Sequence, residues 1–224
     1  MIKVQEVYKV YKNNNVECNA LNGVSLYINS GEFVSIVGNS GSGKSTLLNL
    51  IGALDSVTSG IITVDDIDIS SLSNKCQSIY RNEQIGFIFQ FFYLEPTYSV
   101  YRNVEMPLLI SRVPIRKRSD LILTTLELVN VVEKANNRAS ELSGGEKQRV
   151  CIARALVNNP KIILADEPCG NLDTQNSKVV MRQLKAITAM GKTVILVTHN
   201  IDDARQTDRT ITLQDGIVIK DEIN

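Results

Sequence analysis

The stretch that decides the fold is Phe33–Leu48, FVSIVGNSGSGKSTLL. A short apolar, β-branched run leads into a loop with three glycines, and Lys44 opens a helical pattern. Glycines adopt backbone angles that let successive N–H groups turn toward one phosphate. Lys44 adds a positive charge there, and Ser45 offers a hydroxyl that can coordinate magnesium on the β- and γ-phosphates. Strand, glycines, lysine and helix occur in the order of a P-loop, which a merely flexible Gly/Ser loop would not need.

Length and composition limit the classes of protein that this chain can be. At 224 residues it is expected to form one folded unit. Lys+Arg and Asp+Glu both number 24, so net charge gives no case for a nucleic-acid partner or an anionic membrane. The start, MIKVQEVYKV, does not resemble a signal peptide, and no apolar run approaches the roughly 18 residues of a membrane span. We therefore expect a soluble, cytoplasmic chain.

The four cysteines and one histidine predict neither a zinc site nor a disulfide framework, because the cysteines are scattered without paired spacing. We expect reduced, mostly packed thiols.

Alternating apolar and polar residues flank the P-loop on both sides. Such runs include Ile2, Val4 and Val7, then Leu21–Ile28, and after the P-loop helix Ile61–Ile69. They predict an antiparallel layer, with the polar Asn13–Asn15 tract as a hairpin loop. Tyr11 has two interpretations, an edge-strand aromatic or a ring that stacks on a purine.

The middle of the chain predicts a helical insert. Ile85–Phe89 is a compact apolar strand that ends at Gln90, and Tyr101–Leu156 is mainly helical in pattern. Arg116–Arg118 indicates a solvated helix start, and an apolar helical face is predicted from Leu121, Leu123, Leu126, Leu128 and Val129.

A second glycine-containing segment, ELSGGEKQRVCIARAL, covers Glu141–Leu156. Ser143 and Glu146 have the spacing of a capping box at a helix N-terminus. The pair Gly144-Gly145 lowers helix stability unless something approaches the backbone closely, as a phosphate would. The segment therefore predicts a second anion site.

Two further apolar runs end in polar residues that suit phosphate chemistry. Lys161–Ala165 predicts a buried parallel strand that ends in Asp166 and Glu167, which could be a solvated strand end. With a P-loop in the same sheet, they instead suggest a magnesium ligand and a base for the attacking water. Thr193–Thr198 predicts another buried strand, and His199 follows it at the same sheet edge, where it could act in catalysis or contact a γ-phosphate. The chain closes with a hairpin signal over Thr210–Lys220.

Together these motifs resemble the ATP-binding subunit of ABC transporters over nearly the whole chain. Tyr11 lies at the position of the adenine-stacking aromatic, Gly38–Thr46 at Walker A and Gln90 at the Q-loop. Leu142–Glu146 resembles the signature, Ile162–Glu167 Walker B, Asn171–Asp173 the D-loop and His199 the switch histidine. It implies an α/β fold with a RecA-like P-loop NTPase core, an antiparallel β subdomain, and an α-helical subdomain between Q-loop and signature. The division that it implies for the single ABC ATPase domain 1–224 is a core of residues 1–90 and 158–224 and a helical part of residues 91–157.

The resemblance also implies an ATPase that converts ATP and water to ADP and phosphate with Mg²⁺. Its implied catalytic residues are Lys44, Gln90, Glu167 and His199, and its implied metal ligands are Ser45, Gln90 and Asp166. The residues that it implies for nucleotide binding are Tyr11, Gly38, Asn39, Ser40, Gly41, Ser42, Gly43, Lys44, Ser45, Thr46, Ser143, Gly144, Gly145, Glu146 and Asp173.

The implied partners are a second copy of the chain and a separate transmembrane permease, with no nucleic acid. In the implied homodimer, Ser143 and Gly145 of one subunit cover the γ-phosphate held by the other, so ATP lies at the interface. Phe91–Leu94 is the expected docking face for the permease, which would hold the chain on the inner face of the cell membrane.

The sequences of Asn103–Leu108 and Gly170–Asp173 resemble those of one branch of the family. This branch contains lipoprotein-releasing, macrolide-exporting, cell-division and antimicrobial-peptide-resistance ATPases. Glu146, Cys169 and Val57 depart from its commonest residues, Gln, Thr and Pro, and none of these changes removes a phosphate or metal ligand. This points to an exporter of a peptide, lipid-linked or antibiotic-like substrate. The alternatives are an envelope mechanotransmitter that moves no substrate and a soluble ABC ATPase without a permease.

Overall fold

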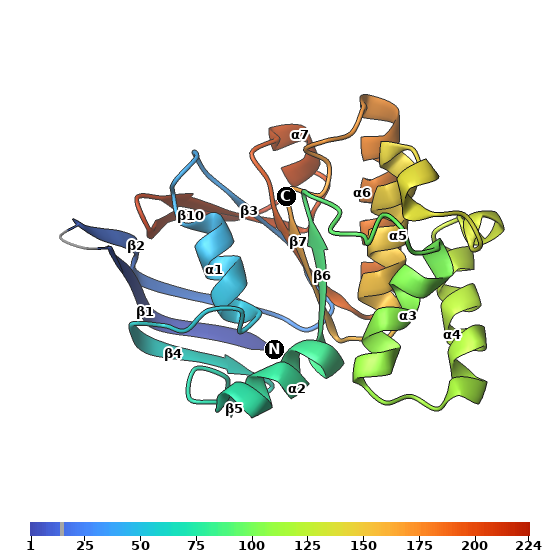
Figure 1. The fold of residues 1–224 in the computed structure, drawn as a ribbon. Coiled ribbons are helices and arrows are strands. Elements are labelled where there is room, and N and C mark those ends of the chain that lie inside the picture. Colours follow the sequence, from blue (N-terminus) through green and yellow to red (C-terminus); the bar gives the residue numbers. More distant parts are fainter. Residues whose placement is uncertain (14–15) are drawn as a thin grey trace.

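The computed structural model describes residues 1–13 and 16–224, and a six-stranded sheet organises them (Figure 1). The strand order is β10-β9-β3-β8-β7-β6. Five of these strands are parallel, and β10 pairs antiparallel with β9 at one edge. The strands are β3 (Phe33–Val37), β6 (Ile85–Phe89), β7 (Ile162–Asp166), β8 (Thr193–Val197), β9 (Arg209–Gln214) and β10 (Ile217–Ile223).

The central strands are apolar along their length because both faces of the sheet are covered. In β7, Ile162 and Leu164 pack in one core with α1 (Lys44–Ile51) and the smaller sheet. Ile163 and Ala165 pack in a second core with the helices on the opposite face. The continuous apolar run therefore reports a strand buried on both sides, as predicted.

The carboxyl ends of the parallel strands share one edge of the sheet. Phe89, Asp166 and Val197 lie side by side in register, and β3 runs next to β8. Gln90, Glu167 and the P-loop follow these strand ends directly. Ligands bind at this edge in open α/β sheets.

A smaller antiparallel sheet has the order β2-β1-β4-β5. Its strands are β1 (Ile2–Asn13), β2 (Val16–Ile28), β4 (Ser59–Val64) and β5 (Ile67–Asp68). The expected single strand Ile61–Ile69 is wrong, because the chain turns at Asp65 and Asp66, both with positive φ. The predicted Asn-tract loop includes Asn14 and Asn15, which lie outside the described residues.

A β-bulge explains why the apolar residues of β1 do not alternate evenly. The pairing with β2 shifts register between Val4 and Val7, and Glu6 has φ 48°. One extra residue therefore lies between them, and Val7 returns to the core with no exposed surface.

The segment between β6 and β7 is helical, as predicted. It contains α3 (Val100–Ile110), α4 (Ile115–Leu128), α5 (Gly144–Leu156) and the 3₁₀ turns η1 (Val132–Lys134) and η2 (Ala139–Glu141). These helices form the right-hand part of the molecule in Figure 1 and share their core with α6 (Thr174–Ala189).

The predicted apolar face of α4 is only partly correct. Leu126 and Val129 are buried as predicted, and Ile122 is buried with them, because residues three or four apart share a helix face. Leu121 and Leu128 are exposed. Arg118 is not simply solvated. Its guanidinium donates to the Val113 carbonyl at 2.7 Å.

Helix α2 (Asn74–Gln84) was not predicted, because most of its residues are polar and Tyr80 is its one buried side chain. The remaining helix is α7 (Ile201–Ala204). In the part of the chain that the structure describes, we find no helix with the length and apolarity needed to span a membrane.

The four cysteines are free. Cys151 is buried and Cys169 half-buried, but Cys18 and Cys76 are exposed. The expectation of mostly packed thiols is therefore wrong for two of them.

Candidate functional site

The P-loop connects β3 to α1 in a conformation that depends on its glycines. Gly43 is the N-cap of α1 with φ 99°, and a Cβ there would lie 2.4 Å from the Ala20 carbonyl oxygen. Gly38 is equally restricted, since its Cβ would lie 2.1 Å from the Leu213 carbonyl oxygen. The backbone can therefore approach its neighbours here only without side chains.

Lys44 is folded back over this loop. Its Nζ donates to the carbonyls of Gly38 and Asn39, each at 2.8 Å, and its side chain is buried. Beside it, the buried hydroxyl of Ser42 has no hydrogen-bond partner among the described residues. The ammonium and the N-terminus of α1 make this loop electropositive, as a phosphate site requires.

A pocket of about 640 Å³ lies over the loop. Eight predicted site residues line it, together with Val37, Ile201 and Thr212; the eight are Gly38, Asn39, Ser40, Gly41, Lys44, Ser45, Glu167 and His199. Ile201 and Thr212 were not predicted. Thr212 reaches the pocket because it is paired with Val37 in the sheet, which no local sequence signal indicates.

Ser45 and Asp166 form the metal-binding candidate. The Ser45 hydroxyl donates to Asp166 Oδ1 at 3.0 Å. Two neighbouring ligands of an octahedral Mg²⁺, each about 2.1 Å from the ion, are themselves about 3 Å apart, so this oxygen pair fits the ion. Burial is the main influence on Asp166 and raises the pKa of its carboxyl, while the Ser45 hydrogen bond acts in the opposite direction. A nearby cation would offset the rise in the pKa of Asp166 that burial causes.

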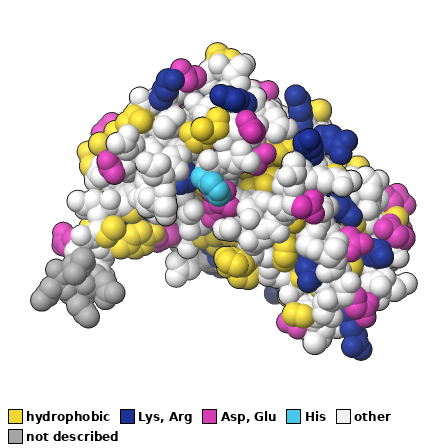
Figure 2. All heavy atoms as spheres, turned by 90° about the horizontal axis from the view of Figure 1, so that it is seen from above, with side chains coloured by type: hydrophobic (Ala, Val, Ile, Leu, Met, Phe, Trp, Pro, Cys, Tyr) yellow, Lys and Arg dark blue, Asp and Glu magenta, His cyan; other side chains and the backbone are white. Residues whose placement is uncertain are grey.

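Glu167 and His199 form a second polar pair at the pocket. Glu167 has φ 47°, and its backbone N–H donates to the Val197 carbonyl at 2.9 Å, which fixes it against the end of β8. Its Oε1 lies 2.8 Å from His199 Nδ1. Figure 2 shows the histidine (cyan) on the molecular surface beside acidic side chains. A carboxylate held at this edge can accept a proton from a water in the pocket.

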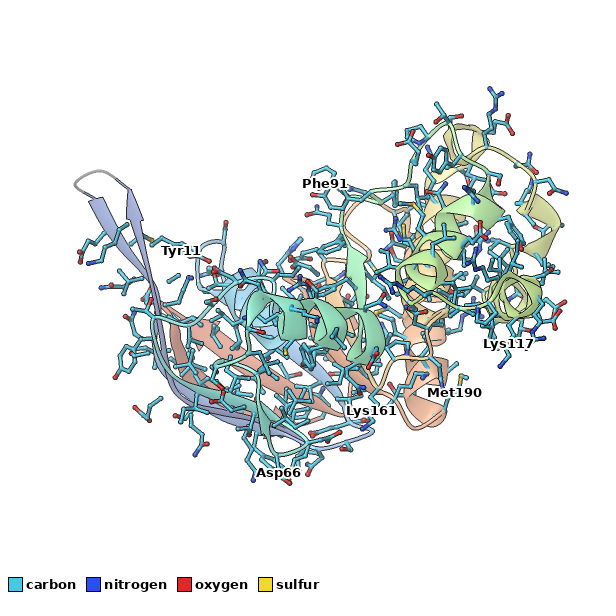
Figure 3. All side chains as sticks on the ribbon, turned by 60° about the horizontal axis from the view of Figure 1, so that its bottom comes forward. Tyr11, Asp66, Phe91, Lys117, Lys161 and Met190 are labelled. Atoms are coloured by element: carbon cyan, nitrogen blue, oxygen red, sulfur yellow. The ribbon has the colours of Figure 1, made fainter. Side chains whose placement is uncertain are left out.

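Tyr11 is separate from that pocket. Its hydroxyl donates to Asp55 Oδ2 at 2.7 Å and also contacts Thr46 in α1. The side chain is 42 % exposed, which leaves ring surface free for stacking. Tyr11 pairs with Cys18 toward the far end of the long β1–β2 hairpin, as Figure 3 shows.

The signature residues do not line the P-loop pocket of the same chain. Ser143 caps α5, and the predicted capping box is present: Ser143 Oγ accepts from the Glu146 N–H at 3.3 Å, and Glu146 Oε2 accepts from the Ser143 N–H at 2.8 Å. The bond from the Ser143 backbone, followed by that from its side chain, lowers the pKa of Glu146. Gly144 is exposed, so its backbone is accessible to a ligand from outside the chain.

Gly145 has a packing role that sequence reasoning missed. A Cβ on it would lie 2.0 Å from Asn176 Oδ1. Asn176 is held in place by Asp173, the N-cap of α6, whose carboxylate accepts from both its backbone and its side-chain nitrogen. The start of α5 thus packs directly on the start of α6.

Gln90 connects the sheet edge to the segment Asn171–Asp173. Asn171 Nδ2 donates to the Gln90 carbonyl at 2.9 Å, and a Cβ on Gly170 would lie 2.9 Å from Gln90 Nε2. Next to this contact, burial and then the Asp203 carboxylate raise the pKa of the Cys169 thiol to about 12. Cys169 is therefore a protonated, packed side chain rather than a reactive thiolate.

Known proteins are similar to this chain over most of its length. The family model described as "ABC transporter" matches residues 21–170. An uncharacterized ABC transporter ATP-binding protein of Bacillus subtilis, YvrO, is 43% identical over 99% of this chain and 97% of its own length. The lipoprotein-releasing system ATP-binding protein LolD of Wigglesworthia glossinidia brevipalpis is 43% identical over 98% of this chain and 96% of its own.

Solved structures show the same fold. The chain is similar to the dimeric structure of MJ0796, a bacterial ABC transporter cassette, with a TM-score of 0.92, 44% identity, and coverage of 100% of this chain and 98% of that one. A second MJ0796 structure, a post-hydrolysis state bound to ADP and Pi, gives a TM-score of 0.92, 43% identity and the same coverage. Motifs, fold and full-length similarity lead to one conclusion: the chain belongs to the ABC transporter family, as an ATPase cassette that uses ATP and Mg²⁺.

Proposed function

We propose that this chain is the ATP-hydrolysing subunit of an exporter, in which ATP-driven pairing of two cassettes powers a separate permease. The observation that carries the proposal is the meeting of two polar pairs, Ser45 with Asp166 and Glu167 with His199, at one sheet edge beside the P-loop.

The side chains divide the hydrolytic work between them. Lys44 and the loop amides bind the β- and γ-phosphates, and Glu167 accepts the proton of the attacking water. His199 orients Glu167 through their 2.8 Å contact. Ser45 and Asp166, with Gln90 at the adjacent strand end, would hold Mg²⁺, which supplies charge neutralisation on the phosphates.

Pairing of two chains follows from where the signature lies. Ser143, Gly144 and Gly145 are absent from the lining of the described P-loop pocket, so in this proposal they contact the γ-phosphate bound by the second copy. Each ATP would then be shared by two chains in a two-fold arrangement. The MJ0796 cassette, described as dimeric, supports this.

The proposed permease contact is the run Phe91–Leu94 after Gln90. Phe91 and Tyr93 are 63 % and 68 % exposed, which is high for aromatic side chains. Figure 3 shows Phe91 at the outside of the molecule, between the sheet and the helical part. Tyr93 and Leu94 also border a groove of about 1070 Å³ with apolar side chains from α3, Met106 and Ile110.

The export function is supported by the relative LolD, which is named for lipoprotein release. We propose the same domain division as the resemblance implies, a core of residues 1–90 and 158–224 and a helical part of 91–157. The permease would keep the chain at the cytoplasmic face of the membrane, and it would select the substrate.

Phosphate release tests the hydrolytic part of the proposal. Lys44→Ala removes the positive charge that would lie beside the phosphates. Turnover should fall at least tenfold, because a loss of about 1.4 kcal/mol of transition-state stabilisation lowers the rate tenfold. Lys12→Ala removes a lysine that pairs with Glu17 on the β-hairpin and serves as the matched control. Equal turnover of the Lys44 variant and the wild type would contradict the proposal.

A further inference from the structure

The ring of Tyr11 is held in place by two side chains, Lys9 and Asp55. Lys9 Nζ lies 4.8 Å from the ring centroid, within the range of a cation–π contact. The same Nζ donates to Asp55 Oδ1 at 2.7 Å, and Asp55 Oδ2 accepts from the Tyr11 hydroxyl at 2.7 Å. One carboxylate thus joins the cation and the phenol.

Lys9 is an unusual residue for its position, since it is only 9 % exposed. Its ammonium has a further partner, the Ser56 carbonyl at 2.6 Å, so the buried charge is paired and hydrogen-bonded. Burial works against the ionised form of Asp55, but the hydrogen bonds from Lys9 and Tyr11 outweigh it, so its pKa is lowered. For Tyr11, burial and then the Asp55 bond raise the pKa, so the phenol keeps its proton and donates.

The loop that carries Asp55 is fixed to both the β-sheet and the P-loop helix. The Val10 N–H donates to Thr58 Oγ1, and the Thr58 N–H donates to the Tyr8 carbonyl, both at 2.9 Å. The other end of this loop continues from α1, whose first residue is Lys44. The position of the Tyr11 ring relative to the P-loop is therefore fixed through Asp55.

We propose that Lys9 and Asp55 are positioning residues for the purine base: they hold Tyr11 at a fixed distance from the P-loop, with the cation over one ring face and the base on the other. This inference rests on the proposed ATPase function and on the adenine-stacking role of Tyr11 that the family resemblance implies. Neither Lys9 nor Asp55 lines the described pocket over the P-loop, so we expect both to act on the base-dependent part of the affinity alone. A residue with only a structural role would weaken binding of base and phosphates together.

The test compares two ligands, MgATP and magnesium tripolyphosphate, by calorimetry or by displacement of a fluorescent nucleotide. Lys9→Met and Asp55→Asn should each weaken MgATP binding by about threefold to tenfold, the range of a partly buried cation–π contact. Tripolyphosphate affinity should stay within about twofold. Lys9→Arg keeps a cation over the ring and should restore most of the MgATP affinity.

Two further variants separate the explanations. In a Tyr11→Ala background, Lys9→Met should cause no further loss, because its effect passes through the ring. Lys12→Met removes a neighbouring charge whose side chain is 73 % exposed, and should leave MgATP affinity unchanged.

The proposal is overturned if Lys9→Met weakens both ligands equally, or if its effect persists in the Tyr11→Ala background. Failure of the underlying assumption looks different. In that case Tyr11→Ala by itself binds MgATP as tightly as the wild type. Folding of each variant is checked by its thermal unfolding midpoint, and Asp55→Asn keeps the test available if Lys9→Met does not fold.

Discussion

Replacing Gly145 by Ala should destabilise the protein, although alanine favours helices. The new Cβ would lie 2.0 Å from Asn176 Oδ1 and 2.4 Å from its Cγ, far inside van der Waals contact. Asn176 cannot simply swing away, because both its nitrogens donate to Asp173. Overpacking of this kind costs about 1–3 kcal/mol, and a glycine-to-alanine change in a helix returns about 1 kcal/mol.

The expected net loss is therefore up to about 2 kcal/mol, which corresponds to a lowering of the unfolding midpoint by up to about 8 °C for a chain of this size. Gly144→Ala is the matched control, since its Cβ would lie 3.7 Å from the nearest atom, Leu172 Cδ2. We expect Gly144→Ala to be neutral or slightly stabilising. Calorimetry without nucleotide excludes any effect on ATP binding.

Asn176→Ala supplies the decisive combination. If the clash is the cause, the double variant Gly145→Ala/Asn176→Ala should be more stable than the two single losses predict by addition, by about 0.5–3 kcal/mol. Equal midpoints for Gly144→Ala and Gly145→Ala, or strict additivity, would refute the reasoning.

Glu167→Gln keeps an oxygen that can accept a hydrogen bond from His199 but removes the base, so phosphate release should fall by about 10²–10⁴-fold. Light scattering should then detect a dimer that depends on uncleaved ATP. A Glu167→Gln protein that binds MgATP but stays monomeric would contradict the sharing of each nucleotide by two chains. Ser143 lowers the pKa of Glu146, so the Glu146 carboxylate stabilises the protein above its unfolded pKa, and that stabilisation is lost as pH falls through the folded pKa. In Glu146→Gln, the free energy of unfolding should therefore fall less between neutral and acidic pH than in the wild type. Urea midpoints between pH 7 and pH 3 that fall equally in both proteins would argue against this. Phe91→Glu should prevent co-purification of a membrane partner and spare basal ATPase activity, whereas Ile115→Glu, at a 79 % exposed position on α4, should affect neither; unfolding of Phe91→Glu would instead place that ring in the core.

Local signals explain most of what the sequence predicted. The P-loop, the capping box at Ser143 and the buried strand before Asp166 each depend on residues within a few positions of one another. Their patterns can therefore be recognised in the sequence alone. The sheet edge that gathers Glu167 and His199 followed from one rule, since parallel strands end on the same side.

Features that depend on contacts between residues far apart in the sequence could not be predicted from the sequence. Lys9 lies two residues after Val7 and therefore on the inward-facing side of β1, and only the distant loop at Asp55 supplies the partner of this buried cation. The packing role of Gly145 depends on Asn176, which is 31 positions away in the sequence. Helix α2 is strongly polar and has one buried side chain, Tyr80, so little apolar sequence marked it as part of the fold.

The hydrogen bond from Asn171 to the Gln90 carbonyl joins two segments that lead to different surfaces of this protein. The exposed aromatic run begins one residue after Gln90, and α6 begins three residues after Asn171, so a ligand that moves one segment would have to break this hydrogen bond or move the other segment with it. Thermodynamic linkage then imposes reciprocity: if a docked partner tightens ATP binding by about tenfold, ATP tightens binding of that partner by the same factor. Either affinity, measured with and without the other ligand, therefore determines the coupling free energy for both.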